Sequence, residues 1–208
     1  MKSRVTKSFW QQTDDRPKPP SLIEDAMAKV CIVGAGIAGL STAYFLNRAG
    51  HSVIVLDDGS VAGGETSRTT AHLSNAIDRR YSSIEWLHGR KGAQLVAESH
   101  SQAIDAIENI VTTEGIDCDF ERLNGYLFAP PGESTQILQR ELDAARRAGL
   151  ASVSLLPKAP LDWLNTGPWL CFPNQAQFHP LKYMTALAAA IEQRGGRIFT
   201  GTHATKIE

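Results

Sequence analysis

Two short apolar runs with a helical pattern between them stand near the start of the sequence. Residues 30–33 (VCIV) and 53–56 (VIVL) are continuously apolar, which favours strands that are buried on both faces. Ala43 and Leu46 lie between these runs at helical spacing. We therefore predict a strand, a helix and a second strand over residues 29–57.

Later segments carry apolar residues at a spacing of three or four, which is typical of one face of a helix. Such helices are predicted over residues 82–114 with a break near Gly89 to Gly92, over residues 133–149, and from Pro180 to about Arg194. Pro180 suits the first turn of a helix, because proline lacks the N–H group that this turn leaves unpaired.

Two segments between and after these helices favour short strands. Asn124-Gly125 is a strong tight-turn pair, so residues 118–129 predict two short strands that meet at this turn. Residues 169–179 predict two further short strands that are split by Pro173. Strands that alternate with helices in this way indicate the α/β class.

The remaining segments are less regular. Residues 150–168 predict a loop with one short strand, and residues 197–208 predict a strand, a turn and a second strand. Residues 1–28 read as an extended arm, because three prolines oppose a helix there. Phe9 and Trp10 are the two aromatics of this arm, and they either anchor it to the body of the protein or belong to a loose tail.

The turn after the first apolar run carries a glycine fingerprint. Gly34, Gly36 and Gly39 have the spacing G-x-G-x-x-G between the predicted strand and the predicted helix. Gly34 would allow the sharp turn, Gly36 would let a pyrophosphate approach the backbone, and Gly39 would let the helix pack closely on the strands. This pattern predicts a dinucleotide site, and the alternative is a glycine-rich turn without a ligand.

Two further features of the unit support the dinucleotide interpretation. The predicted helix starts near Gly36, and its N-terminus offers unpaired N–H groups and a partial positive charge to phosphates, so Ile37 and Ala38 are expected to contact the cofactor. Asp57 ends the second apolar run, 23 residues after Gly34, where its carboxylate can accept hydrogen bonds from ribose hydroxyls. A surface acid at the end of a strand is the alternative for Asp57.

A loop rich in Gly, Ser and Thr follows over residues 58–74. The hydroxyls of Thr66, Ser67 and Thr70 could donate to phosphate, although turn formation also favours these residue types. Arg68 could pair with a phosphate or form an ordinary surface salt bridge.

The composition argues against several classes of function. The chain has 208 residues, of which 42% are hydrophobic and 21% charged, as in an ordinary globular protein. Its formal net charge of −1 gives no reason to expect a nucleic-acid partner. Cys31, Cys118 and Cys171 form no C-x-x-C pair, so we expect neither a metal site nor a disulfide framework. The sequence shows no secretory signal and no membrane-spanning run, so we expect a cytoplasmic protein.

Several segments resemble a known family. The strand–helix–strand unit is similar to the FAD-binding start of the family that contains glycine oxidase, D-amino-acid oxidase and sarcosine oxidase. The segments FWQQTDDRPKPPSL, TSRTTAHL, RLNGYLF and FPNQAQFHPLKY resemble the branch whose members carry a C-terminal Rieske iron–sulfur domain. NAD-dependent dehydrogenases normally continue with another strand–helix unit where the Gly/Ser/Thr-rich loop stands here, which favours a flavin.

The resemblance implies an FAD-dependent oxidoreductase that oxidises a small amine or amino acid by hydride transfer to the flavin. FAD is the implied cofactor, and a 2Fe-2S cluster is implied only for a longer parent protein. Some relatives attach the flavin covalently through a histidine in the Gly/Ser/Thr-rich loop, but that position aligns nearer Arg68 than His72, so His72 is expected to be a polar loop histidine. Ala204 lies where the family brings a strand against the adenine. Substrate-facing residues come mainly from later sequence in this family, so no catalytic residue is assigned. We expect His179 to cap a helix or to be buried with a hydrogen bond.

The resemblance also divides the chain. It implies a Rossmann-like FAD/NAD(P)-binding domain and the start of a second, sheet-containing substrate domain. The expected parts are an N-terminal extended arm over 1–28, the FAD-binding domain over 29–117, a partial substrate domain over 118–180, and an incomplete return to the FAD-binding domain over 181–208. Members of the family are far longer, so this chain is expected to be an N-terminal portion. The alternatives are a truncated FAD-binding fragment without catalytic activity and an NAD(P)-linked oxidoreductase.

Overall fold

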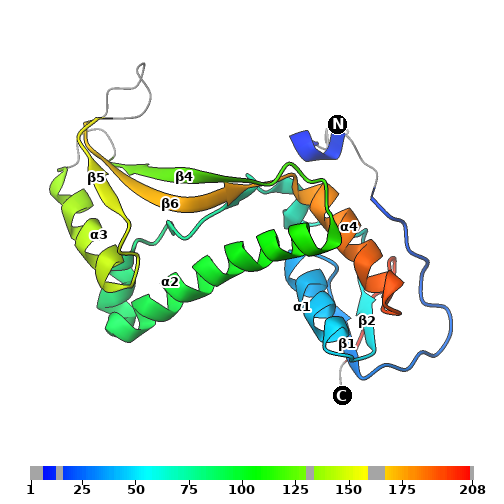
Figure 1. Cartoon of the computed structure of the whole chain (residues 1–208). Coiled ribbons are helices and arrows are strands. Elements are labelled where there is room, and N and C mark those ends of the chain that lie inside the picture. Colours follow the sequence, from blue (N-terminus) through cyan, green and yellow to red (C-terminus); the bar gives the residue numbers. More distant parts are fainter. Residues whose placement is uncertain (1–6, 13–15, 130–133, 159–166, 207–208) are drawn as a thin grey trace, which may run out of the picture. The chain divides into compact units, whose positions relative to one another are not determined.

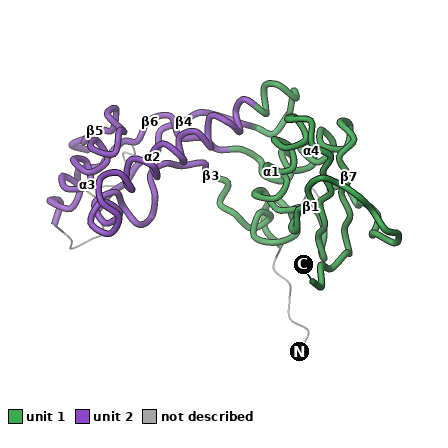
Figure 2. The backbone as a smooth tube through the Cα atoms, turned by 90° about the horizontal axis from the view of Figure 1, so that it is seen from below, with its two compact units in different colours: residues 1–71, 110–119, 178–208 green, residues 72–109, 120–177 purple. Residues whose placement is uncertain are grey.

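The computed structural model describes residues 7–12, 16–129, 134–158 and 167–206, and the chain divides into two compact units (Figure 2). Unit 1 comprises residues 1–71, 110–119 and 178–208, and unit 2 comprises residues 72–109 and 120–177. The N-terminal arm therefore belongs with the Rossmann-like part, and residues 72–109 belong with the second sheet. One return to the FAD-binding domain was expected, at residues 181–208, whereas the chain leaves unit 1 and returns to it twice, at residues 110 and 178.

Unit 1 contains a parallel sheet with the strand order β1-β2-β7 (Figure 1). Its strands are β1 (Val30–Val33), β2 (Val53–Leu56) and β7 (Arg197–Phe199). Helix α1 (Ile37–Arg48) connects β1 to β2, as the crossover between parallel strands requires, and it contacts α4 (Pro180–Gln193). The predicted strand–helix–strand unit and the predicted α/β class are confirmed.

A charged network in unit 1 links α1 and α4 to the C-terminal end of a third helix. Glu114 ends helix α2 (Tyr81–Glu114), and its carboxylate accepts hydrogen bonds from the Tyr44 hydroxyl at 2.5 Å and from Arg194 Nη2 at 2.8 Å. The Tyr44 hydrogen bond and the Arg194 guanidinium lower the pKa of Glu114 below its ordinary value of 4.5. The ionised carboxylate therefore stabilises the contact between α1, the end of α2 and α4.

Replacing Glu114 with Gln should change how stability depends on pH. A carboxylate whose pKa is lowered by folding stabilises the protein above its ordinary pKa of 4.5, and this contribution is lost as the pH falls through the lowered value. At neutral pH we expect Glu114→Gln to lower the free energy of unfolding by about 1–2 kcal/mol, and we expect the difference to shrink in acid. Urea unfolding across this pH range would test it.

The matched control is Glu192→Gln, because Glu192 is an exposed acid on α4 of the same unit. It should change the unfolding free energy by less than about 0.5 kcal/mol at every pH. A difference between Glu114→Gln and the natural protein that stays constant with pH would contradict the assigned role of the ionised carboxylate.

Unit 2 is built on an antiparallel sheet with the strand order β3-β6-β4, and β5 pairs with β6 (Figure 1). The strands are β3 (His72–Leu73), β4 (Glu121–Phe128), β5 (Ser154–Leu156) and β6 (Trp169–Gln177). Helix α3 (Gln136–Arg147) and the start of α2 enclose a core with the sheet, whose large buried members include Tyr81, Leu138, Leu170 and Phe172. Helix α2 is interrupted at Gly89, which has a φ of 69°, so the predicted break is confirmed.

Strands β4 and β6 correct two predictions. Each is continuous, whereas Asn124-Gly125 was expected to end one strand and Pro173 to split another. The two irregular sites lie opposite each other, where Pro173 and Asn174 of β6 face Asn124 of β4. Asn174 takes a φ of 62°, which asparagine tolerates, and a bulge is one of the few places in a sheet where proline fits. The local turn signals therefore produce one bulge within a long strand pair.

The expected second strand of residues 197–208 is also wrong for the part that the structure describes. Residues 200–206 form no strand, and residues 207–208 lie outside the described ranges. The backbone N–H of Thr200 donates to Pro20 O of the N-terminal arm at 3.0 Å, and its hydroxyl donates to Pro19 O at 2.6 Å. Thr200 therefore forms hydrogen bonds with the N-terminal arm in place of the expected second strand. None of the helices in the described ranges is long and apolar enough to span a bilayer.

Candidate dinucleotide-binding site

The glycine turn between β1 and α1 is tightly folded. Gly34 has a φ of +106°, which favours glycine, and its N–H donates to Leu56 O of β2 at 2.7 Å. A Cβ placed on Gly39 would lie 1.8 Å from Gly34 O, so α1 passes directly over the turn. These two glycines have the structural roles that the fingerprint predicts, a sharp turn and close packing of the helix on it.

Asp57 joins the glycine turn to the loop after β2. Its Oδ2 accepts a hydrogen bond from Ala35 N at 2.6 Å, and its Oδ1 accepts one from Gly59 N at 2.8 Å. A carboxylate has about four lone-pair sites, so these two bonds leave about two for hydroxyl donors. The acid at the end of β2 is therefore both fixed in position and able to receive further hydrogen bonds.

Thr66 stands at the N-terminus of α1. It lies in the 3-10 helix η2 (Glu65–Arg68), and its Oγ1 accepts a hydrogen bond from Ile37 N at 3.2 Å. A Cβ on Gly36 would lie 3.4 Å from the same oxygen. Because Thr66 accepts this bond, its hydroxyl proton is available to an anion at the end of α1, where the first-turn N–H groups also lack partners within the helix.

The N-terminal arm is anchored on the segment that follows Thr66. The 3-10 helix η1 (Phe9–Gln12) includes Trp10, whose Nε1 donates to Thr69 O at 2.8 Å. Gln11 Nε2 donates to Ser67 Oγ at 3.0 Å, and Ser67 Oγ donates to Gly64 O at 2.9 Å. Ser67 is completely buried, so we assign its hydroxyl a structural role rather than a contact with phosphate. The anchored arm, and not the loose tail, is what the structure shows.

His179 fixes the start of α4 next to this arm. It is the N-cap residue, and its Nδ1 accepts from Lys182 N at 3.3 Å. Its ring centroid lies 5.0 Å from that of Trp10 in an edge-to-face arrangement. Burial and the nearby Lys182 ammonium lower the pKa of His179, which keeps the ring neutral and able to accept. The predicted capping role is confirmed.

Three other predicted contacts are not tied to the glycine turn. Arg68 is half exposed and lies 3.8 Å from Glu65, an ion pair of the surface kind that contributes little. Thr70 is exposed, and His72 belongs to β3 of unit 2, where it pairs with Gln177. As contacts of the cofactor, Arg68, Thr70 and His72 stay predictions.

The segment that contains Ala204 lies beside Asp57. Thr202 N donates to Asp57 O at 2.9 Å, and His203 Nδ1 lies 3.5 Å from Asp58 Oδ2. Ala204 follows directly and is partly exposed. Residues far apart in the sequence therefore meet at the carboxyl end of β2, the edge at which α/β sheets bind ligands.

Sequence reasoning missed the groups that hold this site in place. Ala35 and Gly59 contribute backbone N–H groups, which no side-chain pattern reveals. Ser8 and Gln11 bind Ser67 across more than fifty positions of sequence, with Ser8 Oγ donating to Ser67 O at 2.5 Å. In this arm, only the aromatic residues Phe9 and Trp10 indicated from the sequence that it could be anchored.

Residues 29–208 match the family model DAO, described as FAD dependent oxidoreductase. The chain belongs to this family. The putative Rieske 2Fe-2S iron–sulfur protein YhfW of Bacillus subtilis is 35% identical over 201 residues, which is 97% of this chain and 39% of that protein. Gamma-glutamylputrescine oxidoreductase of Escherichia coli is 27% identical over 209 residues, which is 98% of this chain and 49% of that protein. The chain thus spans less than half the length of these relatives.

Solved structures share the fold of this DAO-family chain. L-α-glycerophosphate oxidase from Mycoplasma pneumoniae, determined with FAD bound, gives a TM-score of 0.72 at 18% identity and covers 88% of this chain and 47% of that one. L-amino acid deaminase from Proteus vulgaris gives a TM-score of 0.68 at 18% identity, over 89% of this chain and 42% of that one. Both support the Rossmann-like fold of unit 1.

Proposed function

We propose that unit 1 holds the ADP half of FAD in an enzyme that oxidises a small amine or amino acid. The observation that carries the proposal is the meeting of the glycine turn, Asp57 and the Thr66 hydroxyl at the N-terminus of α1. When bound, FAD supplies the electron acceptor for removal of a hydride from the substrate. The DAO match over residues 29–208 supports the choice of FAD over NAD(P).

Each part of the site fits one part of that ligand. Gly36 leaves the backbone accessible to the pyrophosphate, and the N–H groups of the first turn from Ile37 to Gly39 complement its charge. The Thr66 hydroxyl can donate to the same phosphates, and the Asp57 carboxylate can accept from the ribose hydroxyls. Ala204 offers backbone next to the proposed position of the adenine.

The substrate class rests on the relatives. Gamma-glutamylputrescine oxidoreductase and L-amino acid deaminase carry amine and amino-acid substrates in their names. The similarity to YhfW supports a 2Fe-2S cluster only as a proposal for a longer parent protein. We propose no catalytic residue within these 208 residues.

An absorption spectrum of the purified chain distinguishes this function from its alternative. Flavin bands that bleach on addition of glycine, sarcosine or D-amino acids under anaerobic conditions would support an oxidase built from these residues. Because the chain covers less than half of its relatives, we expect weak flavin retention and no turnover from these 208 residues alone. Stoichiometric flavin with amine oxidation would contradict that expectation, and tight NAD(P) binding without flavin would contradict the proposed function.

Replacing Asp57 with Asn should weaken binding of FAD and of ADP. Asparagine has nearly the same shape but lacks the charge, so it forms weaker hydrogen bonds with the ribose hydroxyls. We expect a loss of about 1–3 kcal/mol in binding free energy, measured by isothermal titration calorimetry. Asp58→Asn is the matched control, because Asp58 is adjacent and its side chain is 73% exposed. Equal affinities in both variants would mark Asp57 as a residue that holds only the loop.

A further inference from the structure

The lining of a cleft in unit 2 includes three arginines and a tryptophan, and none of its residues belongs to the proposed FAD site. Its volume is about 670 Å³, and its lining includes Arg79 and Arg80 from the turn before α2 and Trp86 from the first part of α2. Helix α3 contributes Ile137 and Arg140. The volume lies in the range of small-molecule sites, which is about 300–1,000 Å³.

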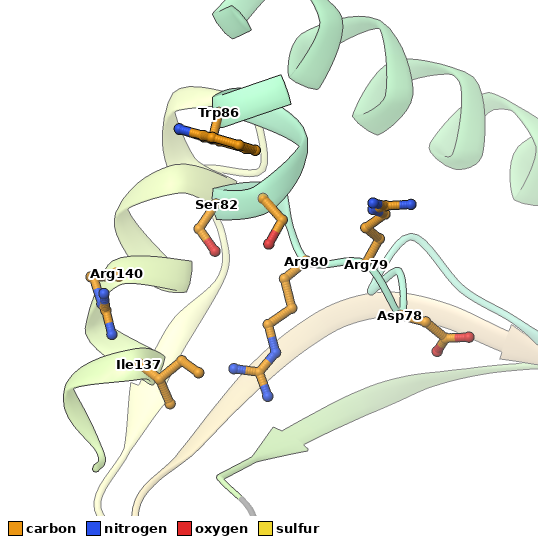
Figure 3. Close-up of a pocket in the computed structure, with 8 residues that line it drawn as sticks. Asp78, Arg79, Arg80, Ser82, Trp86, Ile137 and Arg140 are labelled. Atoms are coloured by element: carbon orange, nitrogen blue, oxygen red, sulfur yellow. The ribbon is translucent and has the colours of Figure 1, made fainter. Parts of the chain in front are cut away.

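Arg80 has two unfavourable features in this cleft. Its backbone takes a φ of 57°, a left-handed conformation that is uncommon for a residue with a long side chain. Its Nη1 is shielded from solvent and has no hydrogen-bond partner within the described ranges. Figure 3 shows the Arg80 side chain extending from the turn, and Ile137 of α3 lines the same cleft. A shielded guanidinium nitrogen without a hydrogen-bond partner, on a strained backbone, indicates that a bound ligand supplies the acceptor.

The buried acid at the start of α2 has donors of its own. Glu141 of α3 is buried and accepts from Tyr81 N at 2.6 Å, from Ser82 N at 3.0 Å and from Ser82 Oγ at 2.8 Å. Its carboxylate therefore caps the N-terminus of α2, which already provides the anion that this helix end favours.

The lining of the cleft is positive overall. Three arginines, Arg79, Arg80 and Arg140, stand against one acid, Asp78, which leaves a formal charge of +2. Trp86 is 83% exposed and contributes an apolar surface to the lining, and Ile137 adds a second apolar side chain. Arginine guanidinium groups suit carboxylate and phosphate because their planar fork can donate two parallel hydrogen bonds.

We propose that this cleft binds a small organic anion with two acidic groups, with Arg80 and Arg140 as its charged ligands and Trp86 against its carbon skeleton. The acidic groups are carboxylates or phosphates, since both present the acceptor geometry that the arginines match. The site is separate from the proposed cofactor site in the residues that form it, so it would serve recognition of a substrate-like or regulatory anion.

Calorimetric titration of the chain with succinate, citrate and inorganic phosphate at constant ionic strength tests the proposal. We expect saturable binding of at least one probe, and a loss of at least about tenfold in affinity in Arg80→Met. Tighter binding of citrate or succinate would identify carboxylates, and tighter binding of phosphate would identify a phosphorylated ligand. Arg90→Met is the matched control, because Arg90 is an exposed arginine of α2 at 3.4 Å from Glu85 and outside the cleft. It should stay within about twofold of the natural chain.

Equal affinities in Arg80→Met and the natural chain would overturn the proposal, because the anion would then bind elsewhere, for example at the glycine turn. A loss of the same size in Arg90→Met would also overturn it, since the effect would reflect net charge alone. If circular dichroism shows that Arg80→Met does not fold, Arg140→Met takes its place. A saturable change in tryptophan fluorescence on addition of the probe, absent in Trp86→Phe, then reports on the cleft itself.

Discussion

A valine at position 36 should remove most of the affinity for FAD and leave the folded chain intact. Gly36 has a φ of −78° and a ψ of −176°, an extended conformation that valine adopts readily. A Cβ there would lie 3.4 Å from Thr66 Oγ1, which is ordinary van der Waals contact. The added methyl groups would instead fill the space through which the pyrophosphate is proposed to approach the backbone. We expect a loss of about 2 kcal/mol, or about thirtyfold in Kd.

A graded pair of variants makes this test sharp. Titration calorimetry with FAD and with ADP should show affinity falling from the natural chain to Gly36→Ala and further to Gly36→Val, as the added volume grows. Melting of the three ligand-free chains should coincide within about 0.5 kcal/mol in stability, because the glycine conformation is open to all three residues. Unchanged affinity in a folded Gly36→Val would place the pyrophosphate away from this turn.

The strand–helix–strand unit and its acid could be predicted because their signals are local. Residues 30–57 contain two complete apolar runs, a turn that glycine spacing specifies, and a helix between them, so little depends on distant sequence. The roles of Gly34 and Gly39 follow from the same short segment. Asp57 was identified from its place at the end of a strand, and its carboxylate does face the glycine turn.

The wrong strand predictions came from signals that are local in sequence but are decided by long-range pairing. Asn124-Gly125 is a turn pair when read alone, and Pro173 breaks a strand when read alone. In the structure the two sites lie opposite each other, and β4 and β6 pair on both sides of them, so one bulge accommodates both. Only knowledge of which strand pairs with which would have shown this.

The remainder of the site depends on contacts between distant segments. Ser67 has the residue type of a phosphate donor, yet the N-terminal arm and the turn at Gly64 take up its hydrogen bonds. Arg80 in unit 2 has no motif around it, and the shielding of its Nη1 is evident only in the folded structure, in which α2 and α3 line the same cleft. The roles of Ser67 and Arg80 could not be predicted from local sequence, because they depend on which distant segments bury these side chains.

Alanine at position 39 should destabilise the fold itself. In an ordinary helix, Gly→Ala raises stability by about 1 kcal/mol, because alanine has the better helix propensity. Here the new Cβ would lie 1.8 Å from Gly34 O and 3.0 Å from Gly34 C, and both are backbone atoms of the turn. No flexible side chain can move to relieve the overlap, so either α1 must shift away from β1 or the turn must open. We expect a loss of about 3 kcal/mol or more in the free energy of unfolding.

Urea unfolding followed by far-ultraviolet circular dichroism measures this loss, and Gly64→Ala is its control. Gly64 has a φ of −82°, and a Cβ there would meet no atom within 4 Å, so the same chemical change should stay within about 0.5 kcal/mol. Gly39→Ala should also bind FAD and ADP more weakly, because displacement of the turn moves the Ala35 N–H away from Asp57. If Gly39→Ala unfolded at the same urea concentration as the natural chain, the close packing of α1 on the glycine turn would not exist in solution. The proposed position of the pyrophosphate, which depends on that packing, would then be wrong.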